Sequence, residues 1–325
     1  MKKKELLIVT FVFGKEYQGY MPIFLFSLYK HYPEYDARIY VDRKVGKEMQ
    51  RLLALIPGYR EKYQIIPVNK ITNNLLPQQM KAYRWLVYDT SFEQYKYLYI
   101  GDIDIYICKE AIPLHEQHIQ HMESQKLVYS NIVRAYGAEP KWIQEYQKIL
   151  EKIRVYTLIV RIYHKFFYHK RLSGLHFIKV NEYYKAIKQK REQFFKVYYD
   201  TDIVSKIYCL KMKLYSNEAL LYHIIKKSHL RLPMQVIDNI DVLMCNNMES
   251  NNFRPHHGLH FGMWRNRKKA DESFDKYIQT RQYQDMYMQF KEDLAYDAVL
   301  KEIVENSPAK VKRIMNAMVD DLDNR

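Results

Sequence analysis

Two aspartates, Asp102 and Asp104, are the residues whose type and spacing best fit a chemical role. They follow the apolar and aromatic run YKYLYIG, and isoleucines stand on both sides of the pair and between its members. Side chains two positions apart point the same way on an extended backbone. At a strand end such a pair can hold a hard divalent cation, which in turn binds the phosphates of a second ligand. The sequence therefore predicts a metal and phosphate site here.

Two other interpretations of the pair stay open. A strand-end turn with two solvated aspartates would have no chemical function. Phosphatases of the haloacid dehalogenase type also have a strand followed by Asp-x-Asp, with the first aspartate as nucleophile. They usually have Thr or Val two positions beyond the second aspartate and carry the motif near the chain start, whereas Tyr106 stands here and the pair lies well inside the chain. Metal-dependent phosphatase or nucleotidyltransferase chemistry is therefore the first alternative.

The elements that must position the pair alternate between strand and helix. Apolar, β-branched runs predict strands, and apolar residues at helical spacing predict helices. The expected strands are residues 6–12, 37–41, 63–68 and 97–100, and the expected helices are 21–31, 47–56 and 78–88. This rhythm indicates an α/β fold whose mainly parallel sheet is flanked by helices. In such sheets ligands bind outside the carboxyl ends of the strands.

The N-terminal segment imitates a signal peptide, because lysines precede the run LLIVTFVFG. The apolar run is short, lacks a small-residue cleavage site and leads into Lys15 and Glu16, so we expect the first buried strand instead. The second half is less regular. We expect helices over 141–169, over 219–226 with Ser216 as the N-cap, and from about residue 270 onward. We expect strands over 175–180, 234–237 and 259–261, and a polar tail at the end.

Composition sets limits on the kind of protein. The chain has 325 residues, a net charge of +15, and three widely separated cysteines that fit neither a disulfide framework nor a zinc motif, so a cytoplasmic location is expected. The positive charge favours polyanions, namely phosphorylated substrates, anionic lipids or nucleic acid. A non-catalytic membrane- or nucleic-acid-binding module is thus the second alternative. Glycine occurs only nine times, which draws attention to Gly101, Gly174, Gly258 and Gly262.

The sequence resembles the GT-A glycosyltransferases, most closely glycosyltransferase family 8 and its bacterial polysaccharide and lipopolysaccharide relatives. The segment YKYLYIGDIDIYI looks like the metal-binding strand of this family, with its Asp-x-Asp at Asp102 and Asp104. The preceding KAYRWL is similar to a Tyr-x-Arg element whose arginine helps to bind the donor. The resemblance implies that Arg84, with Lys81 one turn earlier, contacts a nucleotide-sugar.

Two further segments follow in the family's order. The run SGLHFIKV resembles the Asn-Ala-Gly strand beside the donor sugar, which implies that Ser173 and Gly174 lie at the sugar; Leu172 replaces the usual Asn. The run NEALL resembles the Asp-Gln-Asp helix start beneath the anomeric carbon, which assigns Asn217 and Glu218 to the catalytic region.

A loose likeness near residue 260 completes the expected site. Family members have a His-x-x-Gly-x-Lys-Pro-Trp segment that supplies the third metal ligand and a diphosphate-binding lysine. In RPHHGLHFGMWR the matching candidates are His257 or His260 as ligand and Arg265, or Arg267 just beyond, in place of the lysine. Imidazole with carboxylates suits Mn²⁺ better than an all-oxygen site, with Mg²⁺ as the alternative.

The resemblance implies a metal-dependent enzyme that moves a hexose, such as galactose or glucose of a UDP-sugar, to a hydroxyl of a glycan or lipid-linked saccharide. If it inverts, Glu218 or Asp238 is the base. The donor base is expected against Phe11 and Phe13, with Asp42 near the uracil or ribose; core packing is the alternative for both aromatics.

The expected organisation is a GT-A catalytic domain over 1–265 and a helical extension over 266–325. The nucleotide-sugar half would cover about 1–110 and the acceptor half about 111–265. The implied place is cell-surface polysaccharide synthesis at the inner face of the membrane, with peripheral contact to anionic lipid and no nucleic acid.

Two other patterns in the sequence are interpreted without a catalytic role. His115, His118 and His121 recur every three residues and are expected on a solvated helix face. The basic and aromatic stretch 152–171 fits either a lipid contact or a core-facing helix with basic flanks.

Overall fold

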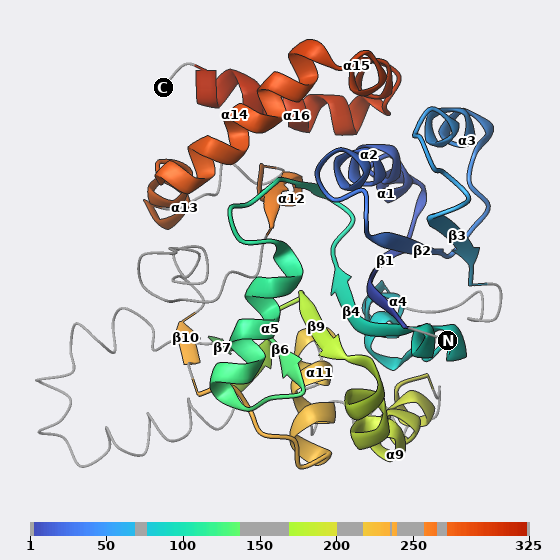
Figure 1. Cartoon of the computed structure of the whole chain (residues 1–325), viewed down its shortest axis with the longest axis vertical. Coiled ribbons are helices and arrows are strands. Elements are labelled where there is room, and N and C mark those ends of the chain that lie inside the picture. The colour runs from blue at the N-terminus through green and yellow to red at the C-terminus, as the bar shows by residue number, and fades with distance from the viewer. Residues whose placement is uncertain are drawn as a thin grey trace, which may run out of the picture.

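The computed structural model describes residues 3–68, 77–136, 169–199, 217–234, 236–238, 257–264 and 272–323. A six-stranded sheet forms the centre of this part of the chain (Figure 1). Its strands, in spatial order, are β3 (Tyr63–Pro67), β2 (Asp36–Val41), β1 (Lys4–Val12), β4 (Tyr95–Gly101), β9 (His176–Lys179) and β6 (Tyr129–Ser130). The first four are parallel, and β9 is antiparallel to both of its neighbours. The expected mixed, mainly parallel sheet is confirmed.

Strand β1 explains how the sheet separates two cores. Successive side chains of a strand point to opposite faces. Leu6 and Ile8 belong to one buried cluster, and Leu7 and Val9 belong to the other. Because both faces are covered, the strand is almost continuously apolar, and it is a sheet strand as expected.

Helices cover both faces of the sheet (Figure 1). One face carries α1 (Lys15–Gln18), α2 (Met21–His31) and α3 (Lys47–Ala54). The other carries α4 (Pro77–Leu86), η1 (Thr90–Gln94), α9 (Val180–Tyr199) and α11 (Asn217–Lys227). Helix α5 (Leu114–Gln125) leads into β6. The four strands and three helices expected in the first half are all present, with ends that shift by a few residues.

Two small sheets extend the fold beyond the central one. One has the order β10 (Val236–Asp238), β7 (Val133–Tyr136), β8 (His169–Leu172), and the other pairs β11 (Gly258–His260) with β5 (Ile105–Ile107). Most of the helix expected over 141–169 lies outside the described residues, which resume at residue 169. That residue is the first of strand β8 and not part of a helix. The strand expected over 259–261 ends at His260, and Phe261 starts helix α12 (Phe261–Trp264).

The C-terminal part is helical, as expected. It contains α13 (Glu272–Ile278), α14 (Arg281–Tyr296), α15 (Ala298–Glu305) and α16 (Ala309–Asp323). Thr280 and Asp297 cap α14 and α15, since each side chain accepts hydrogen bonds from first-turn backbone N–H groups. The expected polar tail is wrong up to residue 323, because α16 buries an apolar stripe that includes Val311, Ile314 and Met318.

This helical part is bonded to the segments around β5 and β11. Asp293 of α14 accepts a hydrogen bond from the Tyr106 hydroxyl at 2.7 Å and lies 3.0 Å from His31 Nε2. Trp264 Nε1 donates to the Tyr283 hydroxyl at 2.8 Å. Burial raises the pKa of Asp293, but hydrogen bonds from His31 and Tyr106 outweigh it and hold that pKa below its ordinary value.

Replacing Asp293 by alanine is expected to lower the free energy of unfolding by about 1–3 kcal/mol, because it removes the acceptor of a buried hydroxyl. Urea titration checks this. Asp285→Ala on the same helix is the control. The carboxylate of Asp285 is exposed and its one ion pair, with Arg281 at 3.9 Å, is also exposed, so it contributes little to stability. Equal effects of the two substitutions would contradict the bracing role of Asp293.

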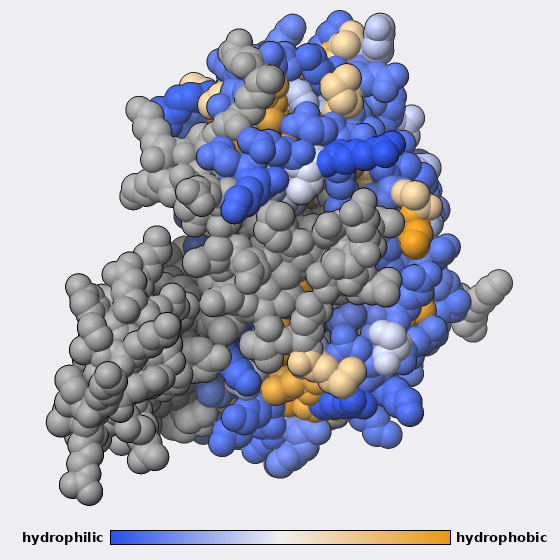
Figure 2. Space-filling model, turned by 90° about the vertical axis from the view of Figure 1, so that its left-hand side faces the viewer, coloured by the Kyte–Doolittle hydropathy of each residue, from blue (hydrophilic) through white to orange (hydrophobic). Residues whose placement is uncertain are grey.

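The described helices include none long and apolar enough to cross a bilayer. The described atoms on the face shown in Figure 2 are mainly hydrophilic, and orange residues are scattered among them. Among the described residues, the large apolar side chains that are exposed are Phe195, Met234, Met288 and Tyr296.

Candidate active site

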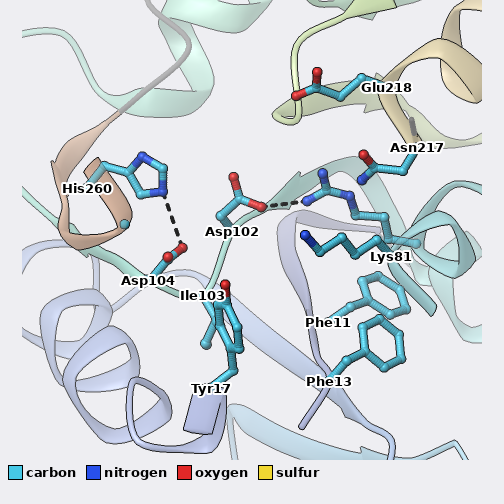
Figure 3. Close-up of a pocket in the computed structure, with 12 residues that line it drawn as sticks. Phe11, Phe13, Tyr17, Lys81, Asp102, Ile103, Asp104, Asn217, Glu218 and His260 are labelled. Atoms are coloured by element: carbon cyan, nitrogen blue, oxygen red, sulfur yellow. Dashed lines mark hydrogen bonds and ion pairs between the residues drawn. The ribbon is translucent and has the colours of Figure 1, made fainter. Parts of the chain in front are cut away.

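A cavity of about 310 Å³ opens at the carboxyl ends of β1 and β4, where parallel sheets bind ligands (Figure 3). It is lined by Phe11, Phe13, Tyr17, Lys81, Arg84, Asp102, Ile103, Asp104, Asn217, Glu218, His260 and Gly262. Nine of these were candidates from the sequence. The fold therefore brings together residues from the first strand, the helix before β4, the acidic pair, α11 and β11.

The two aspartates enter the cavity but have different partners. Asp102 Oδ1 accepts from Arg84 Nη1 at 2.6 Å, and Asp104 Oδ1 lies 3.3 Å from His260 Nε2. Strand β4 ends at Gly101, and the chain bends at Ile103 and Asp104 before β5 begins. The backbone is therefore not extended through the pair, and the two carboxylates point in different directions, that of Asp102 to Arg84 and that of Asp104 to His260 (Figure 3).

Strand pairing brings His260 to the acidic pair. In the β5–β11 sheet His260 lies opposite Ile105, and Phe261 N donates to Asp104 O at 2.8 Å. The imidazole therefore reaches a carboxylate that is 156 positions away in the sequence. A carboxylate with an imidazole is a donor set for a divalent transition metal such as Mn²⁺.

Gly262 keeps the space beside these two groups open. A Cβ at this position would lie 2.5 Å from Asp104 Oδ2 and 3.1 Å from His260 Nε2. No three His, Cys, Asp or Glu side chains of the described segments are placed to hold a metal together, and in this cavity the Asp102 carboxylate is hydrogen-bonded to Arg84. Asp104 and His260 could therefore supply two ligands to a metal ion. Asp102 could supply a third ligand only if its carboxylate moved away from Arg84.

The opposite wall carries cationic and aromatic groups. Helix α4 supplies Lys81 and Arg84, and the Arg84 guanidinium lies 4.3 Å from the ring centre of Trp85. Phe11 and Phe13 stand at the end of β1 with ring centres 6.5 Å apart. Both rings line the cavity, and Phe11 also stacks on Tyr40 at 4.9 Å, so it has a packing role as well.

The far side of the cavity contains Glu218 and Asn217 at the start of α11. Glu218 accepts from Arg134 at 3.4 Å and pairs with Arg171 at 3.1 Å. Gly174 faces the same groups, since a Cβ there would lie 3.0 Å from Arg84 Nη2, 3.3 Å from Glu218 Oε1 and 3.6 Å from Asp102 Oδ2. Gly174 thus matters because other groups approach it closely.

Ser173 and Asp42 do not line the cavity. Ser173 is buried, its Oγ accepts from Leu175 N, and its backbone is held by both ends of the Asn131 amide. Asp42 Oδ1 accepts from Gly14 N at 3.1 Å, where the backbone has a φ of 88°. Both side chains hydrogen-bond within the loops that carry site residues, and their expected contact with a ligand stays a prediction.

His257 lies outside the cavity, in a chain of buried polar groups. Its Nδ1 is 2.7 Å from Glu110 Oε1, and its Nε2 is 3.0 Å from His118 Nε2. Both ring nitrogens are therefore engaged, so of the two candidate histidines only His260 is placed to bind a metal in the cavity. His118 also contacts Ser130 at 2.9 Å. The solvated face expected for the His115, His118 and His121 series is wrong, because His118 is fully buried.

The remaining candidates are not placed at the side-chain level. Asp238 ends β10, which pairs with β7, but its side chain is not described. Arg265 and Arg267 lie outside the described residues. Sequence reasoning missed Tyr17, Arg134 and Arg171. The scarcity of glycine was a signal for Gly262, whereas the sequence had no signal for Arg134, and Arg171 stood out only as the last residue of the basic and aromatic stretch 152–171.

Buried histidines predict acid sensitivity. Burial, with a smaller effect of Arg84, lowers the pKa of His176 to about 3, and burial lowers the pKa of His121 to about 4. These rings stay neutral in the folded protein, whereas the unfolded chain protonates them below pH about 6.5. Stability is therefore lost as the pH falls from 6.5 toward the folded pKa, by up to about 1.4 kcal/mol per pH unit for each histidine.

The measurement is the free energy of unfolding between pH 7 and about 4.5, compared for the native chain and His176→Gln. The slope is expected to become shallower by about 1.4 kcal/mol per pH unit in the variant. The exposed His229 provides the control as His229→Gln. An unchanged slope in His176→Gln would show that this ring does not stay neutral in the fold.

No protein-family model and no curated protein matches the sequence. Among solved structures, the chain is similar to core-mannan synthase A (CmsA/Ktr4) from Aspergillus fumigatus in its Mn/GDP form, with a TM-score of 0.40, 11% identity, and 73% of each chain covered. It is also similar to the mannosyltransferase Ktr4p from S. cerevisiae, with a TM-score of 0.41, 11% identity, and coverage of 74% of this chain and 69% of that one.

A third similar structure is the galactosyltransferase LgtC in complex with donor and acceptor sugar analogues. The TM-score is 0.33 and the identity 14%, and the match covers 73% of this chain and 74% of that one. These similarities are too weak to carry an argument about function. The fold is defined by the strand order of the chain itself, and the function is inferred from the chemistry of the cavity.

Proposed function

We propose that the protein is a metal-dependent glycosyltransferase. It would move a hexose, such as galactose or glucose of a UDP-sugar, to a hydroxyl of a glycan or lipid-linked saccharide in cell-surface polysaccharide synthesis. The observation that supports this most is the grouping of Asp102, Asp104, His260, Lys81 and Arg84 in one cavity at the carboxyl edge of the sheet. Peripheral contact with an anionic membrane belongs to the same proposal.

The two walls of the cavity would have different roles in such a reaction. Asp104 and His260, with Asp102, would hold Mn²⁺ or Mg²⁺, which when bound neutralises charge on a departing diphosphate. Arg84 and Lys81 would add fixed positive charge to the same leaving group. Phe11 and Phe13 would hold the flat base of the nucleotide by stacking, with the donor sugar between Gly174 and Glu218.

Glu218 would accept a proton from an acceptor hydroxyl if the reaction inverts the anomeric centre, with Asp238 as the alternative base. If the configuration is retained, an oxygen of the leaving diphosphate can take that proton. In the second case Glu218 stabilises positive charge on the reacting sugar, because its carboxylate faces the opening left by Gly174.

Ligand-dependent thermal stability tests the proposal. The native chain is measured with Mn²⁺ alone and with Mn²⁺ plus UDP, GDP or CMP, and then with the matching nucleotide-sugars followed by mass spectrometry for hydrolysis. One nucleotide is expected to raise the melting temperature in the presence of Mn²⁺ but not of a chelator. No shift with any nucleotide would count against a transferase, and release of phosphate from a simple phosphate ester would favour the phosphatase alternative.

A further inference from the structure

Strand β11, which carries His260 at its last position, is held by an imidazole–carboxylate contact at each end. At one end His260 Nε2 lies 3.3 Å from Asp104 Oδ1, in the cavity. At the other end His257 directly precedes the strand, and its Nδ1 lies 2.7 Å from Glu110 Oε1, outside the cavity. The second contact therefore holds the strand that presents the candidate metal ligand.

The contact at His257 continues into the core. His257 Nε2 lies 3.0 Å from His118 Nε2 on α5, and His118 Nδ1 lies 2.9 Å from the hydroxyl of Ser130 on β6. The same hydroxyl lies 2.9 Å from His121 Nδ1. His257, His118 and Ser130 are fully buried, and the side chain of Glu110 is 5% exposed. These last four residues form a buried relay that joins β11 to α5 and to the central sheet.

The donor and acceptor roles along the relay follow from Glu110. A carboxylate only accepts hydrogen bonds, so His257 Nδ1 carries a proton and donates to Glu110. Gln117 Nε2 donates to the other carboxylate oxygen at 2.8 Å. Burial disfavours charged imidazoles, and burial, with a smaller effect of His257, lowers the pKa of His118 well below its ordinary value. With neutral rings, His118 Nε2 donates to His257 Nε2, and the Ser130 hydroxyl donates to His118 Nδ1. All three hydrogen bonds then point toward Glu110, and each polarises the next.

The position of His260 depends on how β11 lies against β5. A Cβ at Gly258 would lie 1.8 Å from Tyr106 O, so the two strands are in close contact there and a shift at His257 is passed on along β11. Breaking the relay leaves buried hydrogen-bonding groups without partners, which favours a displaced strand. Such a displacement moves the His260 imidazole relative to Asp104. Groups that orient a metal ligand indirectly typically change metal affinity about 10–100-fold when they are lost.

We propose that the buried relay is a positioning device for the metal site. Through His257 it fixes the imidazole of His260 at the place where this ring and Asp104 can share one cation. The positioning residues are Glu110 and His118, with Ser130 at the far end. This inference rests on the proposed function, because that function assigns the cation to the cavity.

Two substitutions of His118 test the proposal on the full chain. His118→Gln keeps a donor and an acceptor, whereas His118→Leu breaks the relay. Titration with Mn²⁺, followed by paramagnetic resonance of the free ion, is expected to show at least about tenfold weaker binding in His118→Leu and binding within about threefold of the native chain in His118→Gln. Phe177→Leu is the packing control, since the Phe177 ring stacks on His118 at 4.6 Å but has no hydrogen-bonding group. It is expected to bind Mn²⁺ like the native chain.

The ring of His260 gives a second measurement that needs no metal. In protein labelled with ¹⁵N-histidine, the ring signals of His260 are expected to shift in His118→Leu but to stay close to the native ones in His118→Gln and Phe177→Leu. In the native chain the His118 signals are expected to show the proton on Nε2. If the native chain binds no Mn²⁺, the metal assignment fails, and these signals still decide whether the relay positions the ring.

Ser130→Ala provides a milder break, because it removes only the hydroxyl at the end of the relay, and it replaces His118→Leu should that variant not fold. It is expected to shift the His260 signals and to weaken Mn²⁺ binding in the same direction. The proposal would be overturned by unchanged His260 signals in the folded relay-breaking variants. It would also be overturned by a proton on His118 Nδ1, by an equal loss of Mn²⁺ affinity in Phe177→Leu, or by failure of His118→Gln to restore binding.

Discussion

Replacing Asp104 by asparagine is expected to abolish Mn²⁺-dependent nucleotide binding and to lower turnover by about 10²–10³-fold or more. The amide keeps the shape of the side chain but removes the negative charge that faces His260 across 3.3 Å. The fold should persist, because the backbone carbonyl of residue 104, and not its side chain, accepts the hydrogen bond from Phe261 N.

Calorimetric titration of the native and variant chains with Mn²⁺ and the nucleotide checks this result, and circular dichroism checks the fold. Asp285→Asn is the matched control, since Asp285 is an exposed aspartate on α14 far along the chain. Nucleotide binding that still depends on Mn²⁺ in Asp104→Asn would remove this residue from the metal site.

Adding one methyl group at Gly262 is expected to have an effect of similar size. In Gly262→Ala the new Cβ would lie 2.5 Å from Asp104 Oδ2, so either the carboxylate or the start of α12 must move. Because ligand orientation sets metal affinity, we expect Mn²⁺ affinity to fall about 10–100-fold, with little change in the overall fold.

Gly46→Ala provides the control for this substitution. A Cβ at Gly46 meets nothing within 4 Å, and its φ of −64° is allowed for alanine. Mn²⁺ titration of both variants, followed by paramagnetic resonance of the free ion, separates the two cases. Equal Mn²⁺ affinity in Gly262→Ala and in the native chain would show that the metal does not occupy the space beside this glycine.

The sequence allowed good prediction wherever a local pattern determines the structure. The alternation of apolar strands and helices over residues 6–100 defines four parallel strands, because each strand and helix must bury its own apolar face. The acidic pair was found for the same reason, since its place at the end of an apolar strand is visible in the letters alone. The geometry of the pair could not be predicted in the same way, because the bend at Ile103 depends on how β5 pairs with β11.

Features that depend on contacts between distant segments were predicted less well. His257 and His260 have the same residue type and similar neighbours, so only the strand register shows that one faces Asp104 and the other faces Glu110. His118 was expected on a solvated face because a period of three fits an exposed helix stripe. Its burial results from contacts with Phe177 of β9 and with His257, which no local pattern indicates.

The two-stranded sheet of β5 and β11 also has a consequence for the time at which the site can form during synthesis. Asp104 leaves the ribosome 156 residues before His260, a delay of roughly 8–30 s at usual rates of translation. The braces from Asp293 and Tyr283 are made later still. A nascent chain can therefore complete its parallel strands early while the cavity lacks one wall, so the cavity can be completed only after the segment of β11 has been synthesised.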